Sequence, residues 1–219
     1  MTFPMFSFSP WSLHVREACL LDQRLSDLTV HLKRTPNNHE QISAKVWWAL
    51  PSTTFSDRIW TLRLDDENGS QVAVRMALFI CHQVLPILEA EYPESKHPRA
   101  TVEAIETWLA NPTKENISTI RSMRSLLNKN EYHIQSAEAA AFAIFFAASL
   151  AYKIQVIGSL DAIISDLTDS IDFALYAVQR STMRDFYPDA ETKKQAAAEA
   201  ETKLRIELSA YLDRLYGEP

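Results

Sequence analysis

Glycine is scarce in this chain, and the scarcity limits the folds that the sequence can adopt. Only Gly69, Gly158 and Gly217 occur among 219 residues. Strand-rich folds and phosphate-binding loops need glycine where a backbone φ angle is positive or where the backbone approaches a ligand closely. With 47% apolar residues, the chain still has enough hydrophobic side chains to bury a core. The sequence therefore predicts an all-α fold.

Prolines and apolar residues at helical spacing divide the chain into segments. Pro86 lies inside one of them and should kink or break that helix, because proline lacks the backbone N–H that bonds to the preceding turn. We expect a compact bundle of seven or eight helices. Their expected ranges are 10–35, 40–50, 70–92, 98–111, 113–127, 136–152, 159–187 and 189–215.

The N-terminal third of the sequence is harder to interpret. Residues 52–69 fit a helix or a strand equally well, so a short hairpin or strand near residues 59–72 stays open. We expect a single helical domain over residues 1–219. Within it, residues 1–70 would form an N-terminal extension packed on residues 72–180.

Charge and composition argue against several classes of partner. The formal net charge of -6 disfavours nucleic acid, and the basic patch of Arg121, Arg124 and Lys129 is too sparse for a nucleic-acid footprint. The longest apolar run, residues 139–152, is shorter than the roughly 20 residues that a membrane-spanning helix needs. The first ten residues lack the pattern of a secretory signal. We expect a cytoplasmic protein with no membrane insertion.

The sequence contains no recognisable catalytic, cofactor-binding or metal-binding motif. Cys81 and His82 are adjacent, but neighbours on a helix point about 100° apart and cannot form a thiolate dyad with each other. Glu103 and Glu106 lack the second half of a di-metal site and fit surface charges. The six histidines lack the spacing that brings two imidazoles to one metal: His14, His31, His39, His82, His97 and His133.

The helix after Gly158 carries the most informative surface. An apolar stripe runs along it, and the aspartates Asp161, Asp166, Asp169 and Asp172 fall on the other side. Phe173 and Tyr176 project among these acidic residues. Either another helix covers the two rings, or they belong to an interaction surface. The candidate partner-binding residues are Asp166, Asp169, Phe173 and Tyr176.

One segment of the chain resembles a known family. A proline-interrupted helix, a proline-arginine helix start and a tryptophan-bearing helix follow one another in Val84, Leu85, Pro86, Ile87, Leu88, Glu89, Tyr92, Pro93, Pro98, Arg99, Ile105 and Trp108. This pattern resembles the all-helical immunity protein family of bacterial polymorphic toxin systems, over roughly residues 72–180. The resemblance implies a cytoplasmic protein of bacterial competition that binds a cognate protein toxin and neutralises it. It does not identify the toxin.

Three hypotheses about function follow. The first is an immunity protein, and its acidic charge could steer it onto a basic toxin. The second is a helical adaptor or regulatory protein that binds another partner. The third is an enzyme whose site is assembled from dispersed polar residues. Without a catalytic motif, we expect no enzyme and no cofactor. Two of the residues that carry the resemblance have structural roles that we expect from their own chemistry. Trp108 should be a core anchor, and Arg99 should bond to carbonyls or pair with Glu89 or Glu94.

Overall fold

The fold is described from a computed structural model of the chain. Its residues fall in two compact units, one of Met1–Gly69 with Leu215–Pro219 and one of Ser70–Arg214. The structure describes residues 5–7, 26–27, 29–30, 32–33, 41–43, 46, 58–59, 62, 68–127, 132–156, 160–184 and 189–217.

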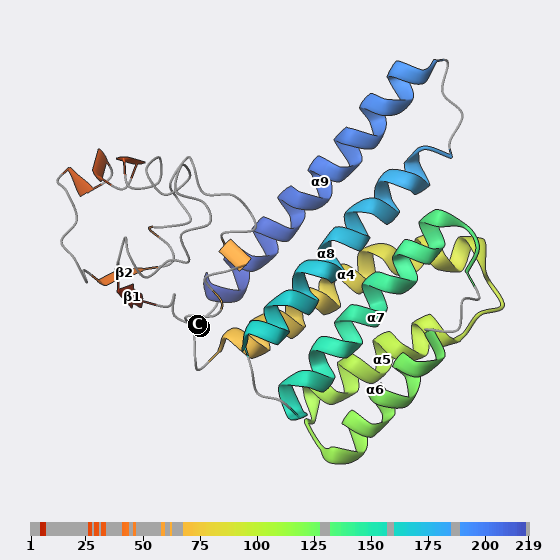
Figure 1. Ribbon diagram of the computed structural model, residues 1–219, viewed down its shortest axis with the longest axis horizontal. Coiled ribbons are helices and arrows are strands. Elements are labelled where there is room, and N and C mark those ends of the chain that lie inside the picture. Colours follow the sequence, from red (N-terminus) through yellow and green to blue (C-terminus); the bar gives the residue numbers. More distant parts are fainter. Residues whose placement is uncertain are drawn as a thin grey trace. The chain divides into compact units, whose positions relative to one another are not determined.

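The larger unit is a bundle of long helices, shown in Figure 1. Six of them occur in the described residues: α4 (Gly69–Glu91), α5 (His97–Ala110), α6 (Lys114–Leu127), α7 (Gln135–Val156), α8 (Leu160–Thr182) and α9 (Ala190–Gly217). Helix α7 packs most extensively on α8, and it also contacts α5 and α6. The fold class is therefore all-α, as predicted.

The smaller unit contains the two described strands. Strand β1 (Met5–Ser7) pairs antiparallel with β2 (Gln41–Ser43), and Phe6 lies opposite Ile42. Each strand has three residues. The helix expected over residues 40–50 is thus wrong at its start, although Val46 is helical. The hydrogen-bonding partner of β2 lies more than 30 residues away, so the local sequence pattern could not reveal it.

The sequence left a helix and a strand open near residues 59–72. Among the described residues there, Ile59 is helical, Leu62 lies in a 3₁₀ turn and α4 begins at Gly69, so no strand occurs in them. The predicted count of seven or eight helices is also slightly too high for the described residues. Within the expected first helix, the described residues 26–27, 29–30 and 32 are helical. The rest of that helix lies outside the described residues.

Helix α4 is buried on nearly all sides, as its apolar sequence predicted. Val74, Cys81, Leu85 and Leu88 are all buried. Pro86 does not break the helix, which continues to Glu91. Both Pro86 and His82 are exposed, so the His82 carbonyl that loses its helical donor lies on the side of the helix that water can reach.

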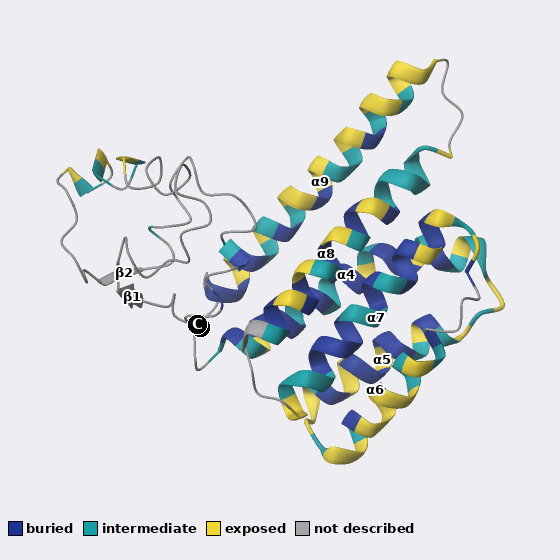
Figure 2. Cartoon of the chain, viewed as in Figure 1, coloured by how far each residue is buried: buried dark blue, intermediate teal, exposed yellow. Residues whose placement is uncertain are grey.

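The helix boundaries follow local sequence signals. Pro98 stands in the first turn of α5, where a missing N–H costs nothing. The Thr113 hydroxyl accepts a hydrogen bond from the backbone N–H of Asn116 and so caps the start of α6. Asp189 does the same for α9 through the N–H of Thr192, at 2.7 Å. The core then forms where the apolar faces meet, as the buried residues in Figure 2 show.

Side chains tie α4 to its neighbours. Arg99 of α5 forms a two-pronged ion pair with Glu89, with N–O distances of 2.7 and 2.8 Å. Of the partners proposed for Arg99, Glu89 is therefore the one that it contacts. The Phe79 ring stacks on Tyr211 of α9 with centroids 4.5 Å apart. The Trp108 side chain is buried, as expected for a core anchor.

Two helices of the described chain, α4 and α7, are long and apolar enough to cross a membrane by length and composition alone. More than half of each apolar window is buried inside the protein. The core helix of a soluble protein passes the same test, so this property is weak evidence for a membrane span.

Candidate interaction surface on α6, α7 and α8

One face of α7 combines aromatic and polar side chains. Phe142, Phe145, Ser149 and Tyr152 follow one another at three- and four-residue intervals, which places them on the same side of the helix. Eight of the remaining positions of α7 are buried alanines. Their small side chains let α8 approach closely, and the Ser170 hydroxyl of α8 donates a 2.8 Å hydrogen bond to the Ala143 carbonyl. The tight α7–α8 contact fixes where the aromatic face lies.

Four phenylalanine rings of α7 and α8 contact one another. Phe173 stacks on Phe142 with centroids 5.0 Å apart and on Phe146 with centroids 5.6 Å apart. Phe145 and Phe146 meet edge to face at 5.5 Å. These rings are only partly buried. We define the aromatic row as six residues: Phe142, Phe145, Phe146 and Tyr152 of α7, with Phe173 and Tyr176 of α8.

Arginines lie over the tyrosine rings of the aromatic row. The guanidinium carbon of Arg124 is 5.2 Å from the Tyr152 ring centroid, and that of Arg121 is 6.0 Å from it. Arg180 lies 4.8 Å above the ring of Tyr176. Such cation–π contacts hold the long arginine side chains in place. In the part of the chain that the structure describes, none of these arginines forms an ion pair with a carboxylate.

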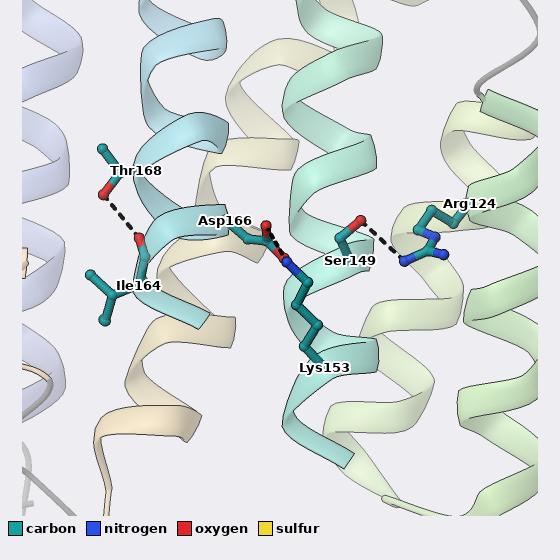
Figure 3. A network of polar contacts seen from close by, with 6 residues as sticks. All are labelled: Arg124, Ser149, Lys153, Ile164, Asp166 and Thr168. Carbon is teal, nitrogen blue, oxygen red and sulfur yellow. Dashed lines mark hydrogen bonds and ion pairs between the residues drawn. The ribbon is translucent and has the colours of Figure 1, made fainter. Parts of the chain in front are cut away.

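A buried ion pair lies beside this face, as Figure 3 shows. Lys153 Nζ is 2.8 Å from Asp166 Oδ1, and the two side chains are 30% and 6% exposed. Burial raises the pKa of Asp166, and the hydrogen bond and charge of Lys153 partly oppose that rise. The second oxygen, Oδ2, is buried without a hydrogen-bond partner among the described residues. Among the described residues, the Asp166 carboxylate thus receives its hydrogen bond and its compensating charge from Lys153.

Arg124 belongs to the same polar network. Its Nη1 atom donates a hydrogen bond to the Ser149 hydroxyl at 3.3 Å. Its charge also lowers the pKa of Asp166, although the two groups form no direct contact within ion-pair distance. Three helices therefore contribute to one polar cluster at the edge of the aromatic row (Figure 3).

The four predicted partner-binding residues have different surroundings. Asp166 is buried and paired, although the sequence placed it on the side opposite the apolar stripe. That expectation is wrong for Asp166, because Lys153 of the neighbouring helix draws it inward. Asp169 and Phe173 are half-buried, and Tyr176 is 37% exposed. Phe173 and Tyr176 both join the aromatic row, and the partner-binding role of all four residues stays a prediction.

The apolar stripe of α8 agrees with the sequence at its described positions. Ile164, Leu167, Ile171 and Ala174 are buried. Val178 is half-buried. The side chain of Asp161 lies outside what the structure describes. The predicted apolar stripe of α8 is therefore confirmed at these positions, whereas the predicted exposed side of the helix does not include Asp166.

The sequence did not point to the role of α6 and α7 in this surface. No surface role was assigned from the sequence to the phenylalanines of α7, and Arg121 and Arg124 were considered only as part of a nucleic-acid footprint. The three- and four-residue spacing of Phe142, Phe145 and Tyr152 could have indicated that these rings share one face of α7. The contact of Arg124 with Tyr152 could not be foreseen, because it joins two different helices.

The polar groups here give little support for catalysis. Lys153 Nζ donates a 2.8 Å hydrogen bond to Asp166 Oδ1, and no described hydrogen bond joins it to the Ser149 hydroxyl. Cys81 is fully buried, and desolvation raises the pKa of its thiol. The exposed His82 pairs instead with Glu106 at 3.1 Å. Cys19 and the Asp65–Asp66 pair lie outside the described residues.

Outside this surface, the described chain has no group of metal ligands, and it has two open hollows. No group of three or more His, Cys, Asp or Glu residues there could hold a metal ion. Two open surface hollows have volumes of about 620 and 630 Å³. One is lined by residues of α6 and the other by residues 91–97.

Comparison with family models, curated proteins and solved structures returned no match to this chain.

Proposed function

We propose that this chain is an immunity protein that acts in the bacterial cytoplasm and neutralises a cognate protein toxin by direct contact. The aromatic row of α7 and α8 is the proposed contact surface. The observation that carries the proposal is this set of partly exposed, stacked rings, with arginines held over its tyrosines.

The composition of this surface suits protein binding. Aromatic residues and arginine are enriched at protein interfaces, and tyrosine and arginine are frequent hot spots. Rings that are already stacked lose little side-chain entropy when a partner binds. The row extends along α7 from Phe142 to Tyr152, which is about 15 Å at 1.5 Å per residue. That length fits the centre of a protein interface.

The resemblance to immunity proteins supports the same function, and it lies in residues that hold the helices together. Its matching residues in α4 and α5 have structural roles, since Arg99 pairs with Glu89 and Trp108 is buried. A shared scaffold with a variable surface on other helices is consistent with proteins that each bind a different toxin. We therefore place toxin recognition on α7 and α8 and not on the residues that carry the resemblance.

A growth-rescue experiment tests the proposed function. The chain is coexpressed with the toxin encoded by the adjacent gene, and survival of the bacterium is scored. Rescue together with a purified complex is the expected result. A lethal toxin that is not rescued, with both proteins expressed, would shift the interpretation to an adaptor with another partner.

A double substitution tests the surface through the affinity of the purified complex. Tyr176→Ala and Asp169→Ala together should weaken toxin binding by about 2 kcal/mol, or roughly thirtyfold in Kd. Ile206→Ala is the matched control, because Ile206 is an apolar residue of α9, 63% exposed, that is not part of the aromatic row. Unchanged affinity in the double variant, with helicity intact, would remove these two residues from the interface.

A further inference from the structure

Arg121 and Arg124 form an arginine pair that is not neutralised by the rest of the described chain. They lie three residues apart on α6, so their side chains emerge from the same face. Both guanidinium groups lie over the ring of Tyr152, and Arg124 also lies 5.7 Å from the centroid of Phe145. The rings therefore hold two positive charges side by side.

Most N–H donors of this arginine pair are unused. A guanidinium carries five N–H donors, and the only hydrogen bond from the pair within the described residues joins Arg124 to Ser149. Other arginines of the chain do find carboxylates: Arg99 pairs with Glu89, and Arg205 pairs with Glu201 at 3.0 Å. The chain has 28 acidic residues, yet none of the described ones forms an ion pair with Arg121 or Arg124.

Asp166 cannot neutralise the arginine pair. The charge of Arg124 lowers the pKa of Asp166, but Lys153 already balances the charge of this carboxylate. Asp169 is half-buried on α8 and forms no ion pair with either arginine. A local positive charge thus remains on a chain whose net charge is -6. At physiological ionic strength charges are screened beyond about 8 Å, so this local charge and not the net charge governs what docks here.

We infer that Arg121, Arg124 and Tyr152 form a docking site for an acidic segment of a protein partner. A carboxylate fits the planar fork of a guanidinium with two parallel hydrogen bonds. The partly exposed rings of Phe145 and Tyr152 would cover an apolar side chain next to that carboxylate. A nucleic acid fits less well, because two arginines are too few to follow a continuous row of phosphates. The inference deepens the proposed function and rests on it only for the identity of the partner.

Selection from a random linear-peptide library on the immobilised full chain tests this chemistry without the toxin. We expect enrichment of peptides that carry Asp or Glu beside an apolar residue. Arg121→Gln with Arg124→Gln should weaken the selected acidic peptides by more than about tenfold, as expected for lost hydrogen bonds to a charged group. Arg124→Lys keeps the positive charge but loses the planar guanidinium fork, so its affinity for these peptides should lie between those of the parent chain and the double variant. Arg205→Gln, on α9, is the matched control and should leave binding unchanged.

Several outcomes would overturn the inference. They are a library that yields only neutral or basic peptides, acidic peptides that bind the double variant equally well, and a single-stranded oligonucleotide that binds more tightly than the peptides and depends on Arg124. Arg124-dependent dimerisation in sedimentation experiments would assign the surface to a second copy of the chain instead.

The two proposals fail in different ways. Acidic peptides that depend on Arg124, without rescue from the toxin, would support the docking site and contradict the immunity function. Rescue by a chain in which Arg121 and Arg124 are both Gln, with no acidic peptides selected, would support the immunity function and contradict the docking site.

Discussion

Replacing Lys153 by Met leaves the buried Asp166 without the one cation among the described residues that hydrogen-bonds to it. The Asp166 side chain is 6% exposed, and its Oδ2 atom already lacks a partner among the described residues. Methionine keeps most of the lysine's apolar stem, so the substitution mainly removes the charge. The folded state must then bury an uncompensated carboxylate or bind a proton.

The expected loss of stability follows from the exposure of the pair. Removing one partner of a fully buried ion pair costs about 3–5 kcal/mol. Lys153 is 30% exposed, so water reaches one side of the pair and reduces that cost. We therefore expect Lys153→Met to lower the free energy of unfolding by about 2–3 kcal/mol near neutral pH, on the scale of buried-pair losses.

The loss should depend on pH in a defined direction. Burial raises the pKa of Asp166 above its ordinary value of about 3.9, so the folded state binds this proton more tightly than the unfolded state does. The stability that comes from protonation is fully present below about pH 4 and is lost as pH rises through the folded-state pKa. Without Lys153 that pKa rises further, and more stability is lost. The gap between the parent and Lys153→Met should thus be small near pH 4 and widen toward neutrality.

Urea unfolding followed by circular dichroism at acidic and neutral pH measures this gap. Lys203→Met is the matched control, because Lys203 contacts Glu207 only at 3.9 Å on an exposed surface. Adding Asp166→Leu to Lys153→Met should restore stability to within about 1 kcal/mol of the parent, since the charge is then gone. A pH-independent gap, or a double variant no more stable than the single one, would refute this reasoning.

Three further substitutions test the fold. Trp108→Ala should cost about 3–5 kcal/mol in urea unfolding, and Trp108→Phe much less, because the buried indole N–H has no hydrogen-bond partner among the described residues; equal losses would contradict this. Pro86→Ala should raise the melting temperature by restoring the helical donor to the His82 carbonyl, a gain of about 1–2 kcal/mol after the unfolded-state entropy is counted; a lower melting temperature would count against it. Thr113→Ala should cost about 1 kcal/mol by removing the cap that accepts the Asn116 N–H; an unchanged unfolding midpoint would exclude that cap.

Local signals predicted much of the helical unit. Pro98, Thr113 and the apolar spacing of α8 depend on the chain within one or two turns, so the sequence alone places them. Pro86 shows the limit of such signals. The sequence reports its missing donor, but the surrounding bundle decides whether the helix continues.

The smaller unit was harder to predict because its pairing is not local. Gln41–Ser43 has too few residues to show an alternating pattern, and its strand partner, Met5–Ser7, lies far away in the chain. Residues 52–69 fitted a helix or a strand equally well, and the described residues there are helical at 58–59 and form a 3₁₀ turn at Leu62.

The candidate surface was only partly predictable for the same reason. The spacing of Phe173 and Tyr176 on α8 was visible in the sequence. The burial of Asp166, in contrast, follows from Lys153 on the neighbouring helix, and Arg124 reaches Tyr152 from a third helix. Contacts between helices depend on how the helices pack, which a single sequence does not specify.

Side-chain footprinting of the purified chain with and without its bound toxin tests the central claim most directly. Hydroxyl radicals oxidise exposed aromatic and aliphatic side chains, so oxidation reports which of them the toxin covers. We expect oxidation of Tyr152, Tyr176 and Phe145 to fall in the complex, while oxidation of Ile206 on α9 stays unchanged. Protection of Ile206 with the aromatic row still oxidised would contradict the claim that α7 and α8 bind the partner.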